Sequence, residues 1–201
     1  MKLAPLIAAA VLLAASDDPN RRSMDSPGPG GSRSGGLIQA RPLDTPTTEV
    51  CVGDVAPNFS YVGVDGRWHR LRDLVATGPI LLLFGPDELT LRVIEHDRER
   101  LLDLGVIPVA VTDLRSRAAR ALVGRFDLRF TVLSDAQGII ASQFNAYDAR
   151  TGRHYPNWFV VDQKRRVRGV GRKGLPLRGY ASLAANALGL PEPGSAQPVS
   201  R

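Results

Sequence analysis

The sequence predicts an α/β fold in which a central mixed sheet carries helices on both faces and is preceded by a β-hairpin. Two short aliphatic runs, residues 79–84 and 106–112, have the length and the flanking Gly/Pro signals of buried strands. Each run is followed by a segment with apolar residues at helical spacing. An Asp-Gly turn between residues of strand character lies ahead of both runs and indicates the hairpin.

Length and composition indicate one globular domain with tails. A chain of 201 residues is long enough for a single well-buried core, and its 43% hydrophobic and 23% charged residues are ordinary values. The net charge is +6, but the arginines are scattered and interleaved with acids. This pattern favours a solvated basic surface over a nucleic-acid site. The sequence also lacks the stripe of basic and aromatic residues that binds single-stranded nucleic acid.

The first sixteen residues have the pattern of a signal peptide. Lys2 precedes thirteen residues of mostly Leu, Ala, Ile and Val, and this run ends in the small residues Ala14 and Ala15, which Ser16 follows. The run is too short for a permanent membrane span, so we expect no integral membrane segment after its removal. The protein is therefore expected in the periplasm or outside the cell. Translation starting at Met24 would instead leave it in the cytoplasm.

The remaining chain divides into three segments. Residues 17–50 are rich in Pro, Gly, Ser, Thr and Arg and are expected to form a disordered tether, because they cannot bury enough apolar surface to offset their ordering entropy. Residues 51–190 are expected to fold. Residues 191–201 form a polar tail.

Local signals define the first elements of the domain. Asp65-Gly66 between Tyr61-Val62 and Trp68 predicts the hairpin. The run 79–84 is the central strand, and it breaks at Gly85-Pro86. Asp87 is the expected N-cap of a helix over 88–104, and Gly105 is its expected C′ residue.

Further strands and helices follow in alternation. Residues 106–112 are a second buried strand in which Pro108 indicates an edge position or an early strand residue. Residues 113–126 have helical spacing. Residues 155–162 and 167–170 are expected to pair antiparallel and close the sheet, and 179–188 form a last helix that ends at Gly189.

Three segments resemble one known family. Residues 86–93 are similar to the P-x-x-x-T-x-x-C motif of the peroxiredoxins, the alkyl hydroperoxide reductase/thiol-specific antioxidant (AhpC/TSA, redoxin) family. Residues 52–59 resemble its opening G-D-x-A-P-x-F, and residues 130–144 resemble its F-x-L-L-S-D strand and the helix after it. The resemblance covers about residues 52–190. It implies a thioredoxin-like fold, which the order of predicted elements also favours, and thiol-dependent peroxide reduction as the family's activity.

The resemblance does not extend to the nucleophile. Pro86 and Thr90 match the motif, whereas Val93 occupies the position of the peroxidatic cysteine. The later R-x-x-F of the family reads Pro156-Asn157-Trp158-Phe159 here. We therefore expect a degenerate site at Pro86, Thr90 and Val93 with no catalytic residue, in a domain that binds or organises an unidentified protein partner.

Two alternatives remain open. The single cysteine, Cys51, excludes an intrachain disulfide, and a thiol oxidoreductase would have to use it alone or across a dimer. The carboxylates of Glu49 and Asp54 nearby in sequence do not favour a thiolate. The second alternative is a protein whose basic surface docks to an acidic partner.

Three residues are candidates for ligand binding: Thr90, Arg92 and Pro156. Arg92 and free N–H groups at the helix start suggest an anion pocket. Alternatively, Arg92 is a surface residue offset by Glu88 and Glu95. Thr90 and Pro86 can equally be ordinary helix and turn residues. Pro156 resembles the cis-proline segment of thioredoxins, but it is also compatible with a turn or an edge strand.

No metal or cofactor is expected. His69, His96 and His154 are widely separated, and His96 and Asp97 are adjacent, so they point in different directions on a helix. No glycine-rich phosphate loop joins a strand to a helix, and no G-x-S-x-G motif indicates a serine nucleophile.

Overall fold

The computed structural model of the chain describes residues 49–172 and 174–192. The predicted signal peptide, the tether before Glu49 and the tail after Glu192 lie outside these residues. Val50 is buried and its N–H donates to Asn145 Oδ1 at 3.2 Å, so the folded part includes Val50 as well as the predicted 51–190.

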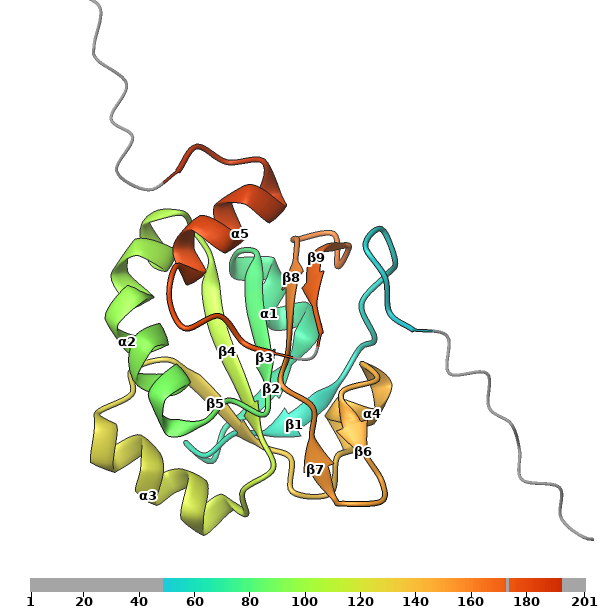
Figure 1. Ribbon diagram of the computed structural model, residues 1–201, viewed down its shortest axis with the longest axis vertical. Coiled ribbons are helices and arrows are strands. Elements are labelled where there is room, and N and C mark those ends of the chain that lie inside the picture. Colours follow the sequence, from blue (N-terminus) through green and yellow to red (C-terminus); the bar gives the residue numbers. More distant parts are fainter. Residues whose placement is uncertain (1–48, 173, 193–201) are drawn as a thin grey trace, which may run out of the picture. The chain divides into compact units, whose positions relative to one another are not determined.

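The core of the fold is a five-stranded mixed sheet, as predicted (Figure 1). Its strand order is β5-β4-β3-β8-β9. The strands β3 (Ile80–Phe84), β4 (Ile107–Thr112) and β5 (Thr131–Ser134) run parallel. The strands β8 (Asn157–Val161) and β9 (Val167–Gly171) complete the sheet as the expected antiparallel pair, and β8 also lies antiparallel to β3.

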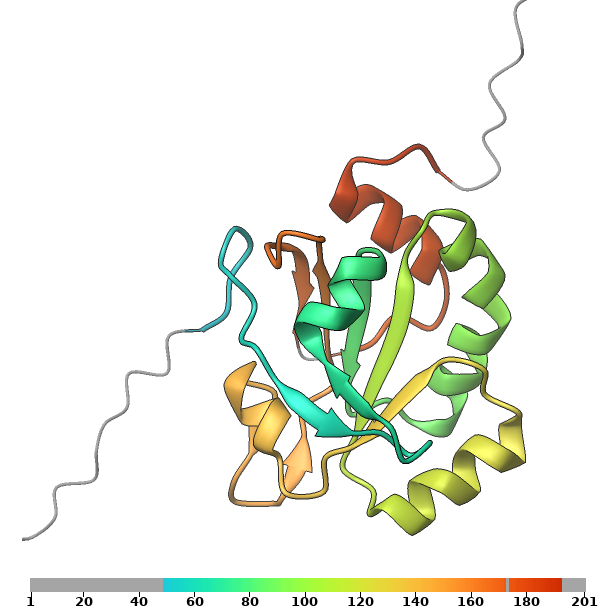
Figure 2. The ribbon, with the colours of Figure 1, turned by 180° about the vertical axis from the view of Figure 1, so that it is seen from behind.

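Helices cover both faces of the sheet, which confirms the predicted layers (Figures 1 and 2). One face carries α2 (Glu88–Asp103), α3 (Ser116–Phe126) and α5 (Tyr180–Leu188). The other carries α1 (Leu71–Thr77) and α4 (Ile139–Gln143). All five residues of β3 are completely buried and alternate between the two apolar clusters, as expected for a central strand.

The predicted hairpin is present. Strands β1 (Ser60–Val62) and β2 (Trp68–Arg70) pair antiparallel, with Val62 opposite Trp68. Gly66 has a φ of +78°, a conformation that glycine adopts without strain. Past the end of β1, Gly63 bridges to Leu133, so the hairpin loop touches the outer edge of β5.

The predicted ends of α2 are also confirmed. The Asp87 side chain accepts a hydrogen bond from the Thr90 N–H at 2.8 Å, and Gly105 follows the helix with a φ of +72°. Pro108 is the second residue of β4, which lies between β3 and β5. It is therefore an early strand residue and not an edge residue, and the missing N–H falls where the strand begins.

Two small features were not predicted. Helix α1 has only two buried side chains and no side-chain hydrogen bond at its N-cap, Arg70, so its sequence carries no capping signal and little periodicity. A second hairpin joins β6 (Tyr147–Asp148) and β7 (Arg153–His154), whose two-residue strands are too short for an alternating pattern.

The buried carboxylate of Asp135 holds the start of α4. Asp135 has no exposed surface, and its oxygens accept hydrogen bonds from the N–H groups of the first three residues of α4 at 2.8–3.0 Å. The His154 Nε2 atom lies 3.5 Å from Asp135 Oδ2 and 3.0 Å from the Asp135 carbonyl oxygen. The same side chain thus holds α4 and contacts β7.

We expect Asp135→Ala to lower the free energy of unfolding by about 3 kcal/mol, because it leaves the buried N–H groups of Ile140 and Ala141 and the part-buried N–H of Ile139 without their acceptor. Urea unfolding at pH 7 measures this loss. The matched control is Asp73→Ala, which removes an exposed carboxylate and should change stability far less. Equal losses in the two variants would contradict this role of Asp135.

Candidate functional site

The candidate site lies where β3 ends and α2 begins. Gly85 has a φ of +57°, and a Cβ added there would lie 3.0 Å from the carbonyl oxygen of His154. Its N–H donates to the Val111 carbonyl at 3.1 Å. A glycine is therefore required at this turn, which directs half-buried Pro86 and the exposed N-cap Asp87 to the carboxyl edge of the sheet.

Thr90 is buried at the first turn of α2. Its backbone N–H donates to Asp87 Oδ1, and a hydrogen bond from its side chain is the main cause of the lowered pKa of Asp87. The first-turn N–H group that could otherwise stabilise an external anion is thus occupied by a side chain of the protein.

Helix α5 packs against α2 beside Thr90. Tyr180 has no exposed surface, its N–H donates to Asp97 Oδ2 at 3.1 Å, and its hydroxyl donates to the Pro176 carbonyl at 2.6 Å. Burial raises the pKa of Tyr180 to about 12, while a hydrogen bond with the Thr90 side chain opposes the rise. The phenol is therefore neutral at physiological pH, and Thr90 lies in a polar cluster closed by α5.

Val93 follows one turn later and is half-buried. Its side chain packs against the apolar cluster between the sheet and α5, which includes Leu83, Ile94 and Tyr180. Valine carries no nucleophile and no titratable group. The contacts of the Val93 side chain are therefore apolar.

Arg92 is exposed and points toward α3, where its guanidinium carbon lies 5.9 Å from the ring centroid of Phe126. Arg92 is thus a surface residue, as the alternative expected, but the two acids expected to offset it pair with other arginines. Glu88 pairs with Arg125, and Glu95 pairs with Arg98 and Arg129. The anion pocket at Arg92 stays a prediction.

Pro156 is exposed and directly precedes β8, whose first residue, Asn157, lies opposite Phe84 of β3. It therefore lies at the same end of the sheet as Pro86. Its peptide bond is trans, as are the others in the described residues, so the resemblance to a cis-proline segment does not extend to the backbone conformation.

Cys51 is exposed and in the free thiol form. Its N–H donates to Asp54 Oδ2 at 2.8 Å, and the segment that follows is held to β9 by a bond from the Gly53 N–H to the Val167 carbonyl. In Figure 1 and in the view from behind in Figure 2, this segment lies beyond β9, across the sheet from α2. The thiol is thus not brought to the start of α2.

Comparison with known proteins gives the family. The sequence profile of the AhpC/TSA family matches residues 52–170. The chain belongs to the AhpC/TSA family. A candidate peroxiredoxin of Mycobacterium tuberculosis, known from two strains, is 29% identical over 147 residues, which make up 68% of this chain and 94% of the relative.

Solved structures share the fold. The peroxidoxin BcpB from M. tuberculosis matches with a TM-score of 0.63 and 23% identity over 68% of this chain and 95% of that protein. PrxQ from Xylella fastidiosa matches with a TM-score of 0.61 and 13% identity over 71% of this chain and 97% of that protein. The predicted thioredoxin-like fold and the AhpC/TSA resemblance are confirmed.

Two residues near this site, Asp97 and Tyr180, were not identified from the sequence. Asp97 is 6% exposed and accepts from Tyr180, and together they attach α5 to α2. One signal was available. Thr90, Ile94, Asp97 and Leu101 follow the spacing of one helix face, so an acid among apolar positions indicated a buried carboxylate with a partner.

The described residues contain no group of three or more side chains suited to a metal ion. Within 49–172 and 174–192, no helix has the length and hydropathy needed to cross a membrane.

We expect Thr90→Val to raise the pKa of Asp87 toward 3.8, the ordinary value of an Asp carboxyl, because it removes the largest cause of the lowering. A lowered folded-state pKa stabilises the protein above about pH 4 and ceases to do so as the pH falls through that lowered value. The stability difference between wild type and variant should therefore be largest at neutral pH and shrink in acid. Carboxyl NMR titration and urea unfolding at pH 7 and pH 3 measure both effects.

The control is Thr77→Val, which removes an exposed hydroxyl that bonds only to the Leu74 carbonyl. It should leave the Asp87 titration unchanged. An unshifted Asp87 in Thr90→Val would show that the Thr90 hydroxyl does not stabilise the carboxylate.

Proposed function

We propose that this protein is an AhpC/TSA domain that no longer reduces peroxides and acts as a binding or scaffold domain. The family's activity is thiol-dependent peroxide reduction. The observation that supports its loss is Val93, which packs into the apolar cluster under α5 at the position where the P-x-x-x-T-x-x-C motif has its cysteine.

The chemistry of the family explains why this position is decisive. A thiolate attacks one oxygen of the O–O bond, becomes a sulfenic acid and releases water or an alcohol. Helix N–H groups normally favour such a thiolate. Here the Thr90 N–H is bonded to Asp87, whose negative charge disfavours a second anion beside it.

A thiol oxidoreductase that uses Cys51 is the second candidate, because this thiol is exposed and free. Its surroundings do not resemble an activated thiol. The Cys51 backbone N–H donates to the Asp54 carboxylate and the Cys51 carbonyl accepts from the Asp54 N–H, and the segment borders β9 rather than a helix start.

Wild-type protein given hydrogen peroxide and a dithiol reductant is expected to show no turnover above the rate without protein, since its one thiol lies away from α2. Peroxide consumption and reductant oxidation are followed together. A working peroxiredoxin assayed in parallel is the positive control.

Cys51→Ser separates the two candidates. If the wild type turns over and Cys51→Ser does not, the protein is a thiol peroxidase and the proposed function is wrong. Equal background rates in the two proteins support a non-catalytic domain.

We also propose that the protein acts outside the cytoplasm, on the signal-peptide pattern of residues 1–16. Mass spectrometry of protein purified from its natural cell is expected to find an N-terminus close to Ser16 in the exported fraction. An N-terminus at Met24 in the cytoplasmic fraction would contradict export.

A further inference from the structure

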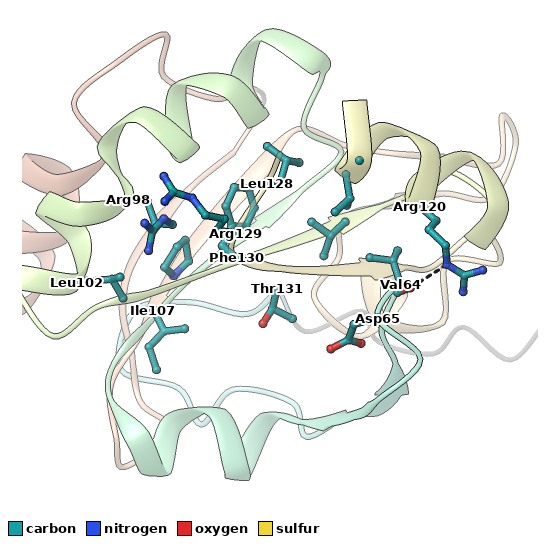
Figure 3. A pocket seen from close by; sticks show the side chains of 14 residues that line it. Val64, Asp65, Arg98, Leu102, Ile107, Arg120, Leu128, Arg129, Phe130 and Thr131 are labelled. Carbon is teal, nitrogen blue, oxygen red and sulfur yellow. Dashed lines mark hydrogen bonds between the residues drawn. The ribbon is translucent and has the colours of Figure 1, made fainter. Parts of the chain in front are cut away.

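A cavity of about 550 Å³ runs along the outer edge of β5 and the start of β4 (Figure 3). Its wall is built from five parts of the chain that are distant in sequence: the β1–β2 loop, α2, β4, α3 and the segment 128–132. It contains none of the residues of the candidate site at the start of α2. What it binds is therefore a separate question from peroxide chemistry.

The middle of the cavity is apolar. Leu128, Phe130 and Val132 come from β5 and the segment before it, Val123 comes from α3, and Leu102 from α2. Leu102 is 45% exposed, so an apolar surface is open to solvent there. Covering it with an apolar group would be favourable.

At one end of the cavity two arginine side chains share one carboxylate oxygen. Arg98 Nε and Arg129 Nε lie 3.1 and 3.0 Å from the same oxygen, Glu95 Oε1, and Glu95 Oε2 accepts the Arg129 backbone N–H. Arg98 also lies 3.7 Å from Glu99, which is 80% exposed. Each guanidinium has five donors, and the Arg129 side chain is 59% exposed, so this arginine has donors left for a ligand, whereas Arg98 is 14% exposed.

Figure 3 shows the two guanidiniums side by side next to Phe130, at the end of the cavity near Leu102 and Ile107. An apolar floor beside paired guanidiniums matches a ligand with an apolar body and an anionic end. Two adjacent guanidiniums hold a carboxylate better than one, because each donates charge-assisted hydrogen bonds.

The other end of the cavity is less suited to an anion. Arg120 Nε donates to the Val64 carbonyl at 3.1 Å, but the Asp65 carboxylate also lines the cavity there. Asp65 accepts from the Arg67 N–H and from His69, and these bonds outweigh burial and lower its pKa. Asp65 is therefore a permanent negative charge at neutral pH.

We propose that this cavity binds a small amphipathic carboxylate, with an unbranched apolar body of roughly ten carbon atoms over Phe130 and its carboxylate on Arg98 and Arg129. The carboxylate displaces one guanidinium contact of Glu95 or adds to it. The proposal goes beyond the loss of peroxidase activity and does not depend on it.

The test uses the full chain and decanoate as the probe, followed by calorimetry and by amide NMR shifts. We expect saturable one-to-one binding with a Kd below about 1 mM, with shifts at Leu102, Phe130 and Thr131. Decan-1-ol, which lacks the charge, and acetate, which lacks the chain, should each bind at least about tenfold more weakly.

Two variants test the arginine pair in opposite directions. Arg129→Gln should weaken decanoate binding at least about fivefold, since it removes one of the two guanidiniums. Glu95→Gln should strengthen binding, because it removes the carboxylate that competes for both. Arg117→Gln, an exposed arginine of α3 that does not line the cavity, is the matched control and should have no effect.

Thermal unfolding of each variant establishes that it is folded at the temperature of the titration. The proposal is overturned by an absence of decanoate binding at 5 mM, a concentration about fivefold above the expected Kd. It is also overturned if decan-1-ol binds as tightly, if Arg117→Gln weakens binding as much as Arg129→Gln, or if folded Glu95→Gln binds decanoate more weakly. None of these results bears on the peroxide assay, so each proposal fails separately.

Discussion

The complete burial of β3 is the constraint on which the rest of the structure depends. Its side chains alternate between the two sides of the sheet, with Leu81 and Leu83 facing α2 and α5 and the other three facing α1 and α4. Such a strand has no position for a polar side chain, so polar groups of a functional site must lie beyond its end. The chain turns there at Gly85, in a conformation and a space that exclude a side chain, and the position of α2 follows from that turn.

The start of α2 shows that a protein can share the fold of its family without sharing the reactive groups of the site. The polar groups of this region are used within the protein: Asp87 caps the helix, Thr90 bonds to Asp87, and Asp97 receives the N–H of Tyr180. These contacts attach α5 to α2 and keep Thr90 buried. Membership in the AhpC/TSA family accounts for the arrangement of strands and helices, whereas activity depends on which atoms occupy a few positions.

The sequence predicted those features that local chemistry determines. The sheet, the Asp65-Gly66 hairpin and the two ends of α2 each have a signal within a few residues, and all were found. Helix α1 and the β6–β7 hairpin lack such signals, and they are held by packing against distant parts of the chain. The cover of Thr90 by Tyr180 joins residues 90 positions apart, and the cavity at β5 draws on five segments, so neither could be predicted from spacing.

The distribution of ion pairs explains why a chain of net charge +6 need not carry a strongly basic face. Arginines pair with acids at separate places on the surface, as in Arg153 with Asp113 and Arg168 with Asp162. The electric field of these paired charges is screened within about 8 Å in physiological salt. A local excess of positive charge then affects only an anionic group in direct contact with it. Around Glu95 two guanidiniums share one carboxylate beside exposed apolar surface, so the carboxylate binding proposed there rests on contact geometry and not on long-range attraction.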